Sequence, residues 1–373
     1  YRALGFLSTA VLHPDRDAVT HGIDGHYLSD DGRWKMDDQM FMSDLDGIEN
    51  GMGGFMDFEY TFRKGVTQRL GIEFLDDKVD INDLGYLQRN DNFRIRSAHI
   101  RTSSDLSWAR DNQFDVRGYV QKNRDGLFTG GGIFFSNRTT FSNLTKATVR
   151  LNFFPASYDD LNSFGNGTYR VEERASMSIH WHSDSSKRFY YGFRASFSEE
   201  DLGDFTYTAA TNFVWRPTDR FALNASVKYK ERKGWLLHQE EENFTTFDAV
   251  QWQPKLSIDY FLSAKQQFRV SLQWVGIKAQ EDAFYRIPAT PGSLIAISKP
   301  AGPSNSFSLS QMSLQARYRW EIAPLSDIFV VYTRLADQST ALGSSDFSDI
   351  FSNGYDEPLV NVIVIKLRYR FGS

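Results

Sequence analysis

The last stretch of the chain, Leu359 to Phe371, alternates strictly between two kinds of side chain. A period of two residues is that of a β-strand, so the pattern predicts a strand with one apolar and one cationic face. The apolar face ends in two aromatic residues, and the other face ends in three cations. The apolar face carries Ile363, Ile365, Leu367, Tyr369 and Phe371. The other face carries Val362, Val364, Lys366, Arg368 and Arg370.

Two classes of β protein could contain such a strand. In a soluble sandwich the apolar face meets a core and the cationic face meets water. In a transmembrane barrel the apolar face meets lipid and the polar face lines the lumen. A final strand that ends in aromatic residues favours the barrel, and we expect Tyr369 and Phe371 to be the signal read by the barrel-assembly machinery.

The same alternation recurs along the chain in about 18 segments of roughly 10 to 15 residues. A strand of about 10 residues, tilted by ~45°, crosses the ~25 Å apolar band of an outer membrane. The predicted strands are 1–12, 18–30, 34–46, 52–63, 66–78, 92–105, 112–124, 127–141, 144–154, 168–183, 187–199, 203–216, 219–233, 243–262, 266–283, 306–321, 326–337 and 359–371.

The connections between these segments alternate in length. Short turns lie near residues 31, 64, 185, 218, 264 and 324, and the long links are 79–91, 157–167, 234–242, 284–305 and 338–357. Outer-membrane barrels have short periplasmic turns and long outside loops. We therefore predict an all-β fold, a closed antiparallel transmembrane β-barrel of about 18 strands (16–20). It would form one domain, 1–373, in a bacterial outer membrane, in contact with lipid and lipopolysaccharide.

Composition narrows the function classes. The 373 residues are 15% aromatic, contain no cysteine and carry a formal net charge of -5, with a mean hydropathy of -0.45. No run approaches the roughly 18 to 20 apolar residues of a membrane helix. Absent cysteine excludes disulfide and thiolate chemistry, and mild acidity argues against nucleic acid as a partner.

If the aromatic residues face outward, the inward positions are rich in cations. Rings of Lys and Arg select anions in pores, which favours a channel or uptake pore for small solutes or oligosaccharides. The alternative is a salt-bridged interior in which Glu59, Asp115, Asp259 and Glu321 neutralise the cations. The candidate lumen and selectivity residues are Arg117, Arg150, Arg194, Lys228, Lys230, Arg317, Arg319, Lys366, Arg368 and Arg370.

The long link after the fifth segment is less polar than a solvated loop, so it could fold inward as a constriction or present a contact surface. Its candidate residues are Asn82, Asp83, Leu84, Gly85, Tyr86 and Arg89. Its Asp and Asn residues are typical of turns, and their spacing does not fit a calcium loop. His180 and His182 share a strand face but lack a third ligand, so we expect no metal or cofactor. No catalytic motif appears, so we do not expect an enzyme.

Three segments resemble a known family: NDLGYLQRND (82–91), FVVYTR (329–334) and IKLRYRF (365–371). The family comprises uncharacterised outer-membrane proteins with a C-terminal barrel region, described as a domain of unknown function, usually preceded by a carbohydrate-binding family-nine-like domain. The resemblance implies a barrel, and it raises a second function. The chain could be a structural or export scaffold that anchors a periplasmic sugar-binding domain or joins a larger envelope complex.

Overall fold

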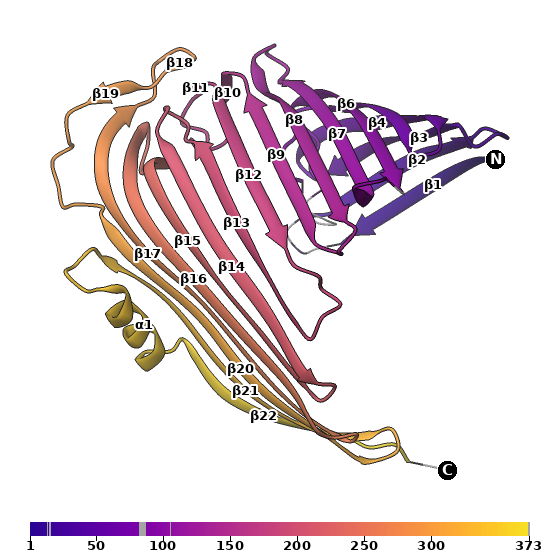
Figure 1. Cartoon of the computed structure of the whole chain (residues 1–373). Helices are drawn as coiled ribbons and strands as arrows, with labels where there is room; N and C mark the ends of the chain where they lie inside the picture. Colours follow the sequence, from indigo (N-terminus) through magenta and orange to yellow (C-terminus); the bar gives the residue numbers. More distant parts are fainter. Residues whose placement is uncertain (13, 15, 82–86, 105, 372–373) are drawn as a thin grey trace. The chain divides into compact units, whose positions relative to one another are not determined.

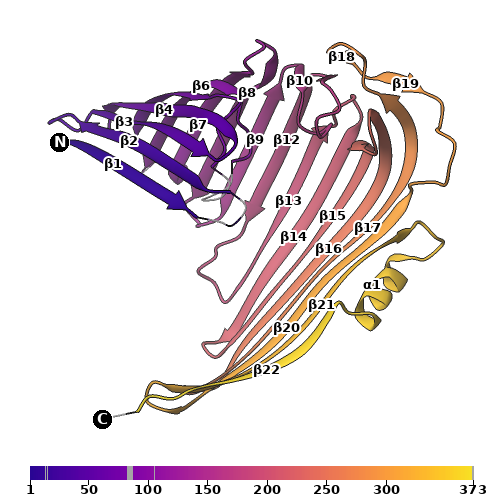
Figure 2. The same cartoon turned by 180° about the vertical axis from the view of Figure 1, so that it is seen from behind.

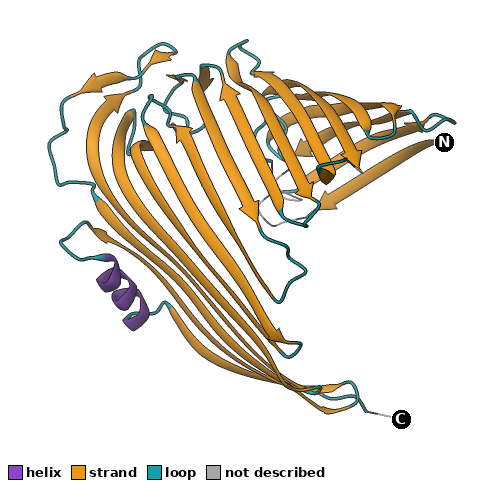
Figure 3. Cartoon of the chain, in the orientation of Figure 1, coloured by secondary structure: helices purple, strands orange, loops and turns teal. Residues whose placement is uncertain are grey.

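The computed structural model describes residues 1–12, 14, 16–81, 87–104 and 106–371, and strands dominate it (Figures 1 and 3). Nineteen strands belong to one sheet, and the described registers within it are antiparallel. The long strands are β1 (Arg2–Val11), β2 (Ala18–Leu28), β3 (Trp34–Leu45), β4 (Ile48–Arg63), β5 (Val66–Leu75), β6 (Asn92–Ser104), β7 (Ala109–Lys122), β8 (Phe128–Phe141), β9 (Lys146–Phe154), β12 (Arg174–His182), β13 (Phe189–Glu199), β14 (Phe205–Thr218), β15 (Phe221–His238), β16 (Asn243–Ser263), β17 (Gln266–Arg286), β20 (Phe307–Ala323), β21 (Ser326–Ala341) and β22 (Val360–Arg368).

Short elements complete the fold. They are β10 (Ser157–Asp159), β11 (Tyr169–Val171), β18 (Gly292–Ser293), β19 (Ile295–Ile297) and the helix α1 (Phe347–Asp356). No helix among the described residues is long and apolar enough to cross a membrane. The prediction of an all-β chain with about 18 antiparallel strands is confirmed, because each predicted segment contains a strand.

The predicted long link 234–242 is wrong. β15 continues to His238 and β16 begins at Asn243, so the connection is a short turn. The pairing register shifts between Arg232 and Trp235, and Gly234 has a φ of +66°. Lys233 and Gly234 therefore form a bulge within the strand, which interrupts the period of two and resembles a turn in the sequence.

By their contacts the described residues form two compact units. Unit 1 contains residues 1–139, 150–175 and 287–294, and unit 2 contains 140–149, 176–286 and 295–373. A single barrel domain over the whole chain stays a prediction.

In unit 1 the register aligns side chains of one kind across neighbouring strands. Met56, Ile72, Ile95 and Val120 are successive partners on β4 to β7, and three of them expose 37–53% of their surface. Asp38 is paired with Met56 and is an exception on this apolar face. The opposite face carries charged residues, so the sheet has one polar and one apolar face.

Unit 2 repeats this arrangement. Tyr260, Phe268, Tyr318, Val330 and Ile365 are successive partners on β16, β17, β20, β21 and β22. The adjacent row, on the other face, contains Asp259, Arg269 and Arg317. On β16, β17 and β20 these adjacent residues thus point to faces of opposite polarity, as the sequence predicts, whereas this polar row continues with Val331 on β21 and Val364 on β22.

The helix α1 covers part of the apolar face of unit 2, over β17, β20 and β21 (Figures 1 and 2). Ile350 packs with Trp274, Met312 and Ala336, all of them buried. Phe347 and Phe351 meet the Trp274 ring edge-on at 6.4 and 5.4 Å between centroids. Trp274 is therefore covered by protein.

The sequence before α1 explains where the helix begins. The Asp346 side chain accepts hydrogen bonds from the backbone N–H groups of Ser348 and Asp349 at 3.0 and 3.2 Å. The Asp349 side chain accepts from the Asp346 backbone at 3.1 Å, which completes a capping box. The predicted link 338–357 therefore contains an ordered helix rather than only a loop.

The link between β5 and β6 folds onto the polar face of unit 1. Val79 is buried, and a Cβ added to Gly51 on β4 would lie 2.4 Å from the Val79 nitrogen. The Asp80 backbone donates to Ser43 Oγ at 3.4 Å. Gly51 and Ser43 are paired at the end of the polar face, so this end of the link lies over that face.

The same link is tied to the one between β9 and β12. Arg89 donates two hydrogen bonds to the Asp160 carboxylate, both at 2.7 Å, and the side chains are 11% and 19% exposed. Near this pair, β10 and β11 form a small sheet with β18, in which Tyr169 is fully buried. The residues expected at the constriction, Asn82 to Tyr86, lie outside the described residues. Arg89, the remaining candidate of this link, joins it to the link between β9 and β12.

We predict that Asp346→Ala frees α1 from the sheet. The Ser348 hydroxyl and the Asp349 N–H hold the Asp346 pKa below its ordinary value of 3.8. Because the folded pKa is lowered, the stabilisation is complete above the ordinary value and is lost as the pH falls through the folded pKa. The measurement is hydrogen exchange, corrected for intrinsic rates. In Asp346→Ala, residues 347–356 should lose protection already at neutral pH. In the unaltered chain, the same residues should lose protection only below about pH 4. Asp346→Asn keeps the acceptor and should remain protected at both pH values; protection unchanged in Asp346→Ala contradicts the capping role.

We predict that Arg89→Ala releases the link between β9 and β12. Breaking a buried ion pair costs ~3–5 kcal/mol, so exchange protection of residues 157–171 should fall by about a hundredfold or more. The control is Arg124→Ala, since Arg124 and Asp77 form an exposed pair at 2.5 Å that contributes little. The exchanged pair Arg89→Asp with Asp160→Arg should recover protection. Equal effects of Arg89→Ala and Arg124→Ala would refute the special role of the buried pair.

Candidate functional site

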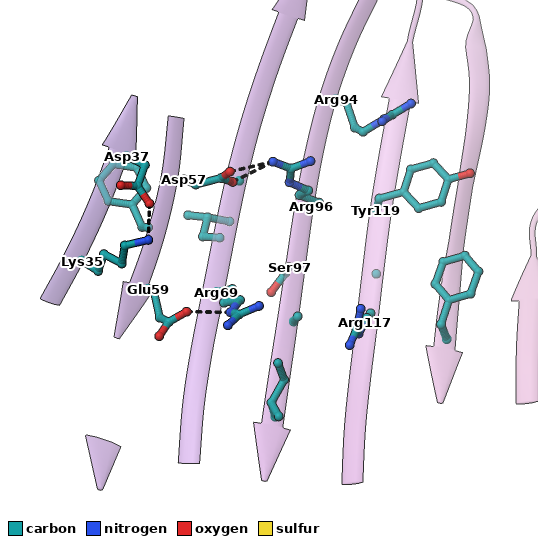
Figure 4. Close-up of a pocket in the computed structure, with 17 residues that line it drawn as sticks. Lys35, Asp37, Asp57, Glu59, Arg69, Arg94, Arg96, Ser97, Arg117 and Tyr119 are labelled. Atoms are coloured by element: carbon teal, nitrogen blue, oxygen red, sulfur yellow. Dashed lines mark hydrogen bonds and ion pairs between the residues drawn. The ribbon is translucent and has the colours of Figure 1, made fainter. Parts of the chain in front are cut away.

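The polar face of β3 to β7 in unit 1 carries a series of ion pairs, within strands and between them (Figure 4). Lys35 and Asp37 approach within 2.6 Å, and Glu59 binds Arg69 Nε at 2.7 Å. Both oxygens of Asp57 accept from one nitrogen of Arg96 at 2.8 Å. Most charges of this region are therefore neutralised by a partner on the same strand, on the next strand or two strands away.

A glycine allows the contact between Asp57 and Arg96, which joins two strands that are not neighbours. Asp57 is on β4 and Arg96 on β6, so their contact must cross β5 above Gly71. A Cβ at Gly71 would lie 2.4 Å from Arg96 Nε and 2.5 Å from an Asp57 oxygen. Gly71 thus leaves the space through which the two side chains meet.

These residues line a cavity of about 690 Å³. Arg94 lies at one side of it, donates to Gln121 at 2.9 Å and covers the Tyr119 ring at 5.6 Å. The lining charges are Lys35, Arg69, Arg94, Arg96 and Arg117 against Asp37, Asp57 and Glu59. Cations thus outnumber acids in a cavity whose size suits a small solute.

Three aromatic residues also lie on the polar face. Tyr119 and Phe134 are nearly parallel at 5.8 Å, and Phe154 meets Phe134 edge-on at 5.3 Å. The expectation that aromatic residues face outward is therefore wrong at these positions. Gly132 explains the exception, because a Cβ there would lie 2.7 Å from the Phe134 ring. The glycine run 130–132 is the signal in the sequence that could have indicated that rings lie flat on this strand.

The candidate lumen residues lie on the polar faces of their own units. Arg117 and Arg150 line a cavity in unit 1. In unit 2 the register places Arg194 opposite Ala210, which is opposite Lys228, and Lys230 follows two residues later. Arg317 and Arg319 on β20 and Lys366 and Arg368 on β22 share the other polar rows. Arg370 lies beyond β22, and its backbone N–H donates to Ser326 Oγ at 3.0 Å.

Two of these cations are neutralised by one buried acid. Asp327, 1% exposed, accepts from Arg319 Nε at 2.8 Å and from Arg368. Glu321, the expected partner, is paired by register with Asp327 itself. Glu59, Asp115 and Asp259 do bind cations, namely Arg69, Arg117 and Arg269. In the described part of unit 2, Arg194, Lys228, Arg317 and Lys366 have neither an ion-pair nor a hydrogen-bond partner.

The His180 and His182 rings are 5.8 Å apart, and the described residues contain no group of three or more His, Cys, Asp or Glu able to hold a metal. Tyr369 and Phe371 meet edge-on at 4.9 Å and are exposed. Their role as an assembly signal stays a prediction.

Comparison with solved structures supports the fold. A double mutant of the ferric enterobactin receptor PfeA from Pseudomonas aeruginosa is similar with a TM-score of 0.53 and 6% identity, over 90% of this chain and 61% of that chain. The siderophore receptor PirA from Acinetobacter baumannii has a TM-score of 0.48 and 9% identity, over 98% and 72%. The chain thus spans about three fifths of the PfeA chain, and the likeness shows the fold alone.

A search of curated proteins finds no significant match. A family model, that of a domain of unknown function named DUF5916, matches residues 4–371, which is nearly the whole chain. This agrees with the resemblance drawn from the segments at 82–91, 329–334 and 365–371. The chain belongs to the DUF5916 family.

Proposed function

We propose that the sheet closes into a barrel in the outer membrane of a Gram-negative bacterium and forms an uptake pore or channel for small anionic or polar solutes. The observation that carries the proposal is the two-faced sheet. Its apolar face is exposed over many strands and its polar face holds the charges, as in outer-membrane barrels.

The exposure of large apolar side chains supports the membrane. Met40, Phe74, Ile133 and Phe193 expose 60%, 50%, 60% and 48% of their surface. Soluble proteins rarely expose such a wide apolar surface, whereas lipid would cover it. The terminal strand β22 is exposed on both faces, with Val364 at 51% and Ile365 at 71%. Closure of the sheet would remove this open edge.

The cations without partners support a preference for anions. The paired charges, such as Glu59 with Arg69, contribute little net field, so selectivity would depend on the unpaired Arg194, Lys228 and Arg317. The solved structure with a TM-score of 0.53 is a ferric enterobactin receptor, and an uptake role for the present chain is our proposal.

A scaffold that binds a periplasmic sugar-binding domain or another envelope protein is the second candidate. The two links joined by Arg89 and Asp160 favour this scaffold role, because the one between β5 and β6 covers part of the polar face. A folded chain that conducts no ions would support this role over transport.

We predict that the purified chain forms a steady, anion-selective conductance in a planar bilayer. Replacing Arg194, Lys228 and Arg317 by Gln should lower the chloride-to-potassium permeability ratio, because three unpaired positive charges are removed. The matched control replaces Glu59 and Arg69 by Gln, which removes a bound pair and leaves the net charge unchanged. The proposal fails if the folded chain does not conduct, or if the triple variant keeps the selectivity of the unaltered chain.

A further inference from the structure

A second concave region lies on the polar face of unit 1, beside the larger cavity. It has a volume of about 300 Å³ and shares Arg117 and Phe134 with the larger cavity. Arg117 comes from β7, Arg138 from β8 and Arg150 from β9. Each of these strands thus contributes one guanidinium group to the lining of one small cavity.

The charges here are not balanced, in contrast to the neighbouring ion pairs. Asp115, 6% exposed, is the one acid among the described residues that lines the cavity, and it pairs with Arg117 at 3.3 Å. Arg138 and Arg150 are exposed, and among the described residues neither has an ion-pair or hydrogen-bond partner. Two guanidinium groups therefore line the cavity without a counter-charge. An anion between them would relieve their repulsion and could accept paired hydrogen bonds from each planar group.

The other lining groups point to more than a simple ion. Gln113, Ser136 and Asn152 supply neutral hydrogen-bonding groups. Phe134 supplies an aromatic ring, which Tyr119 and Phe154 support through the contacts at 5.8 and 5.3 Å. A ring with an apolar face could stack on Phe134 while its hydroxyl groups meet the neutral side chains. The anionic substituent would then lie between Arg138 and Arg150.

We propose that Arg117, Arg138 and Arg150, with Phe134, form a binding site for an acidic saccharide, a sugar ring that carries a carboxylate, sulfate or phosphate group. The inference rests on the proposed uptake function and names its substrate class. Arg138 and Arg150 are the residues that recognise the anion, Arg117 is held by Asp115 at the edge shared with the larger cavity, and Phe134 recognises the ring. Neutral sugars lack the group that would bind the two unpaired cations, so they should bind weakly.

The test is equilibrium binding, measured by calorimetry on the full chain folded in detergent, which does not depend on conduction. The probes are glucuronate, glucose 6-sulfate, glucose 6-phosphate, glucose, and inorganic sulfate and phosphate. At least one acidic sugar should bind about tenfold or more tightly than glucose and than the inorganic ions. Which of the three binds best identifies the anionic group.

Replacing Arg138 and Arg150 by Gln should abolish the preference for the acidic sugar over glucose. The matched control is Lys187→Gln with Lys265→Gln, which removes two exposed cations from turns of unit 2 and should leave binding unchanged. Phe134→Leu should weaken the sugar but not the inorganic ion. Folding of each variant is checked by its altered electrophoretic mobility before heating.

Three results would overturn the proposal: glucose binding as tightly as the acidic sugars, the inorganic ion binding as tightly as the sugar, or the Arg138 and Arg150 double variant losing no more affinity than the matched control. A chain that conducts anions but shows any of these results retains the proposed function and loses this site. A chain that binds an acidic sugar but does not conduct retains the site and loses the pore.

Discussion

The antiparallel register is the constraint on which the rest of this structure depends. A strand turns alternate side chains to opposite faces, so one residue of slippage would exchange the two faces of a strand. The register instead keeps Met56, Ile72, Ile95 and Val120 in one row and places Asp57, Gly71, Arg96 and Tyr119 in the next. Asp57 can meet Arg96 only because the register places the polar positions of these strands in the same row.

The charges on the polar face then divide into two groups with different consequences. Where a carboxylate lies within reach on the same or a nearby strand, as Asp57 does for Arg96 and Asp327 for Arg319, the cation is neutralised and contributes to order. Where the described residues offer none, as for Arg138 and Arg150, the cation has no neutralising partner. The ion pairs expected from the sequence are thus present over part of the polar face of each unit, and attraction of anions by the remaining cations is our proposal.

Much of the fold could be predicted because alternation is a local property of the sequence. It located the strands, including β22 with its apolar and cationic faces, and failed where local chemistry departs from the period, as at the bulge of Lys233 and Gly234. The helix α1 was missed inside a presumed loop, although Phe347, Ile350, Phe351 and Gly354 follow helical spacing after the Asp346 cap. The site was harder to predict. Pairs such as Arg89 with Asp160 join residues far apart in the sequence, and the aromatic cluster of Tyr119 and Phe134 needs the Gly132 backbone to be placed.

The central claim is that one face of this sheet meets lipid and the other meets water. The sequence contains no cysteine, so single cysteines can be introduced and spin-labelled without background. The decisive measurement is the accessibility of labels along residues 55–62 of β4, in lipid vesicles, to oxygen and to a water-soluble nickel chelate. We predict a period of two, with oxygen favoured at 56, 58, 60 and 62 and the chelate favoured at 55, 57, 59 and 61. Labels that meet the chelate equally at every position would contradict the membrane barrel and the function built on it.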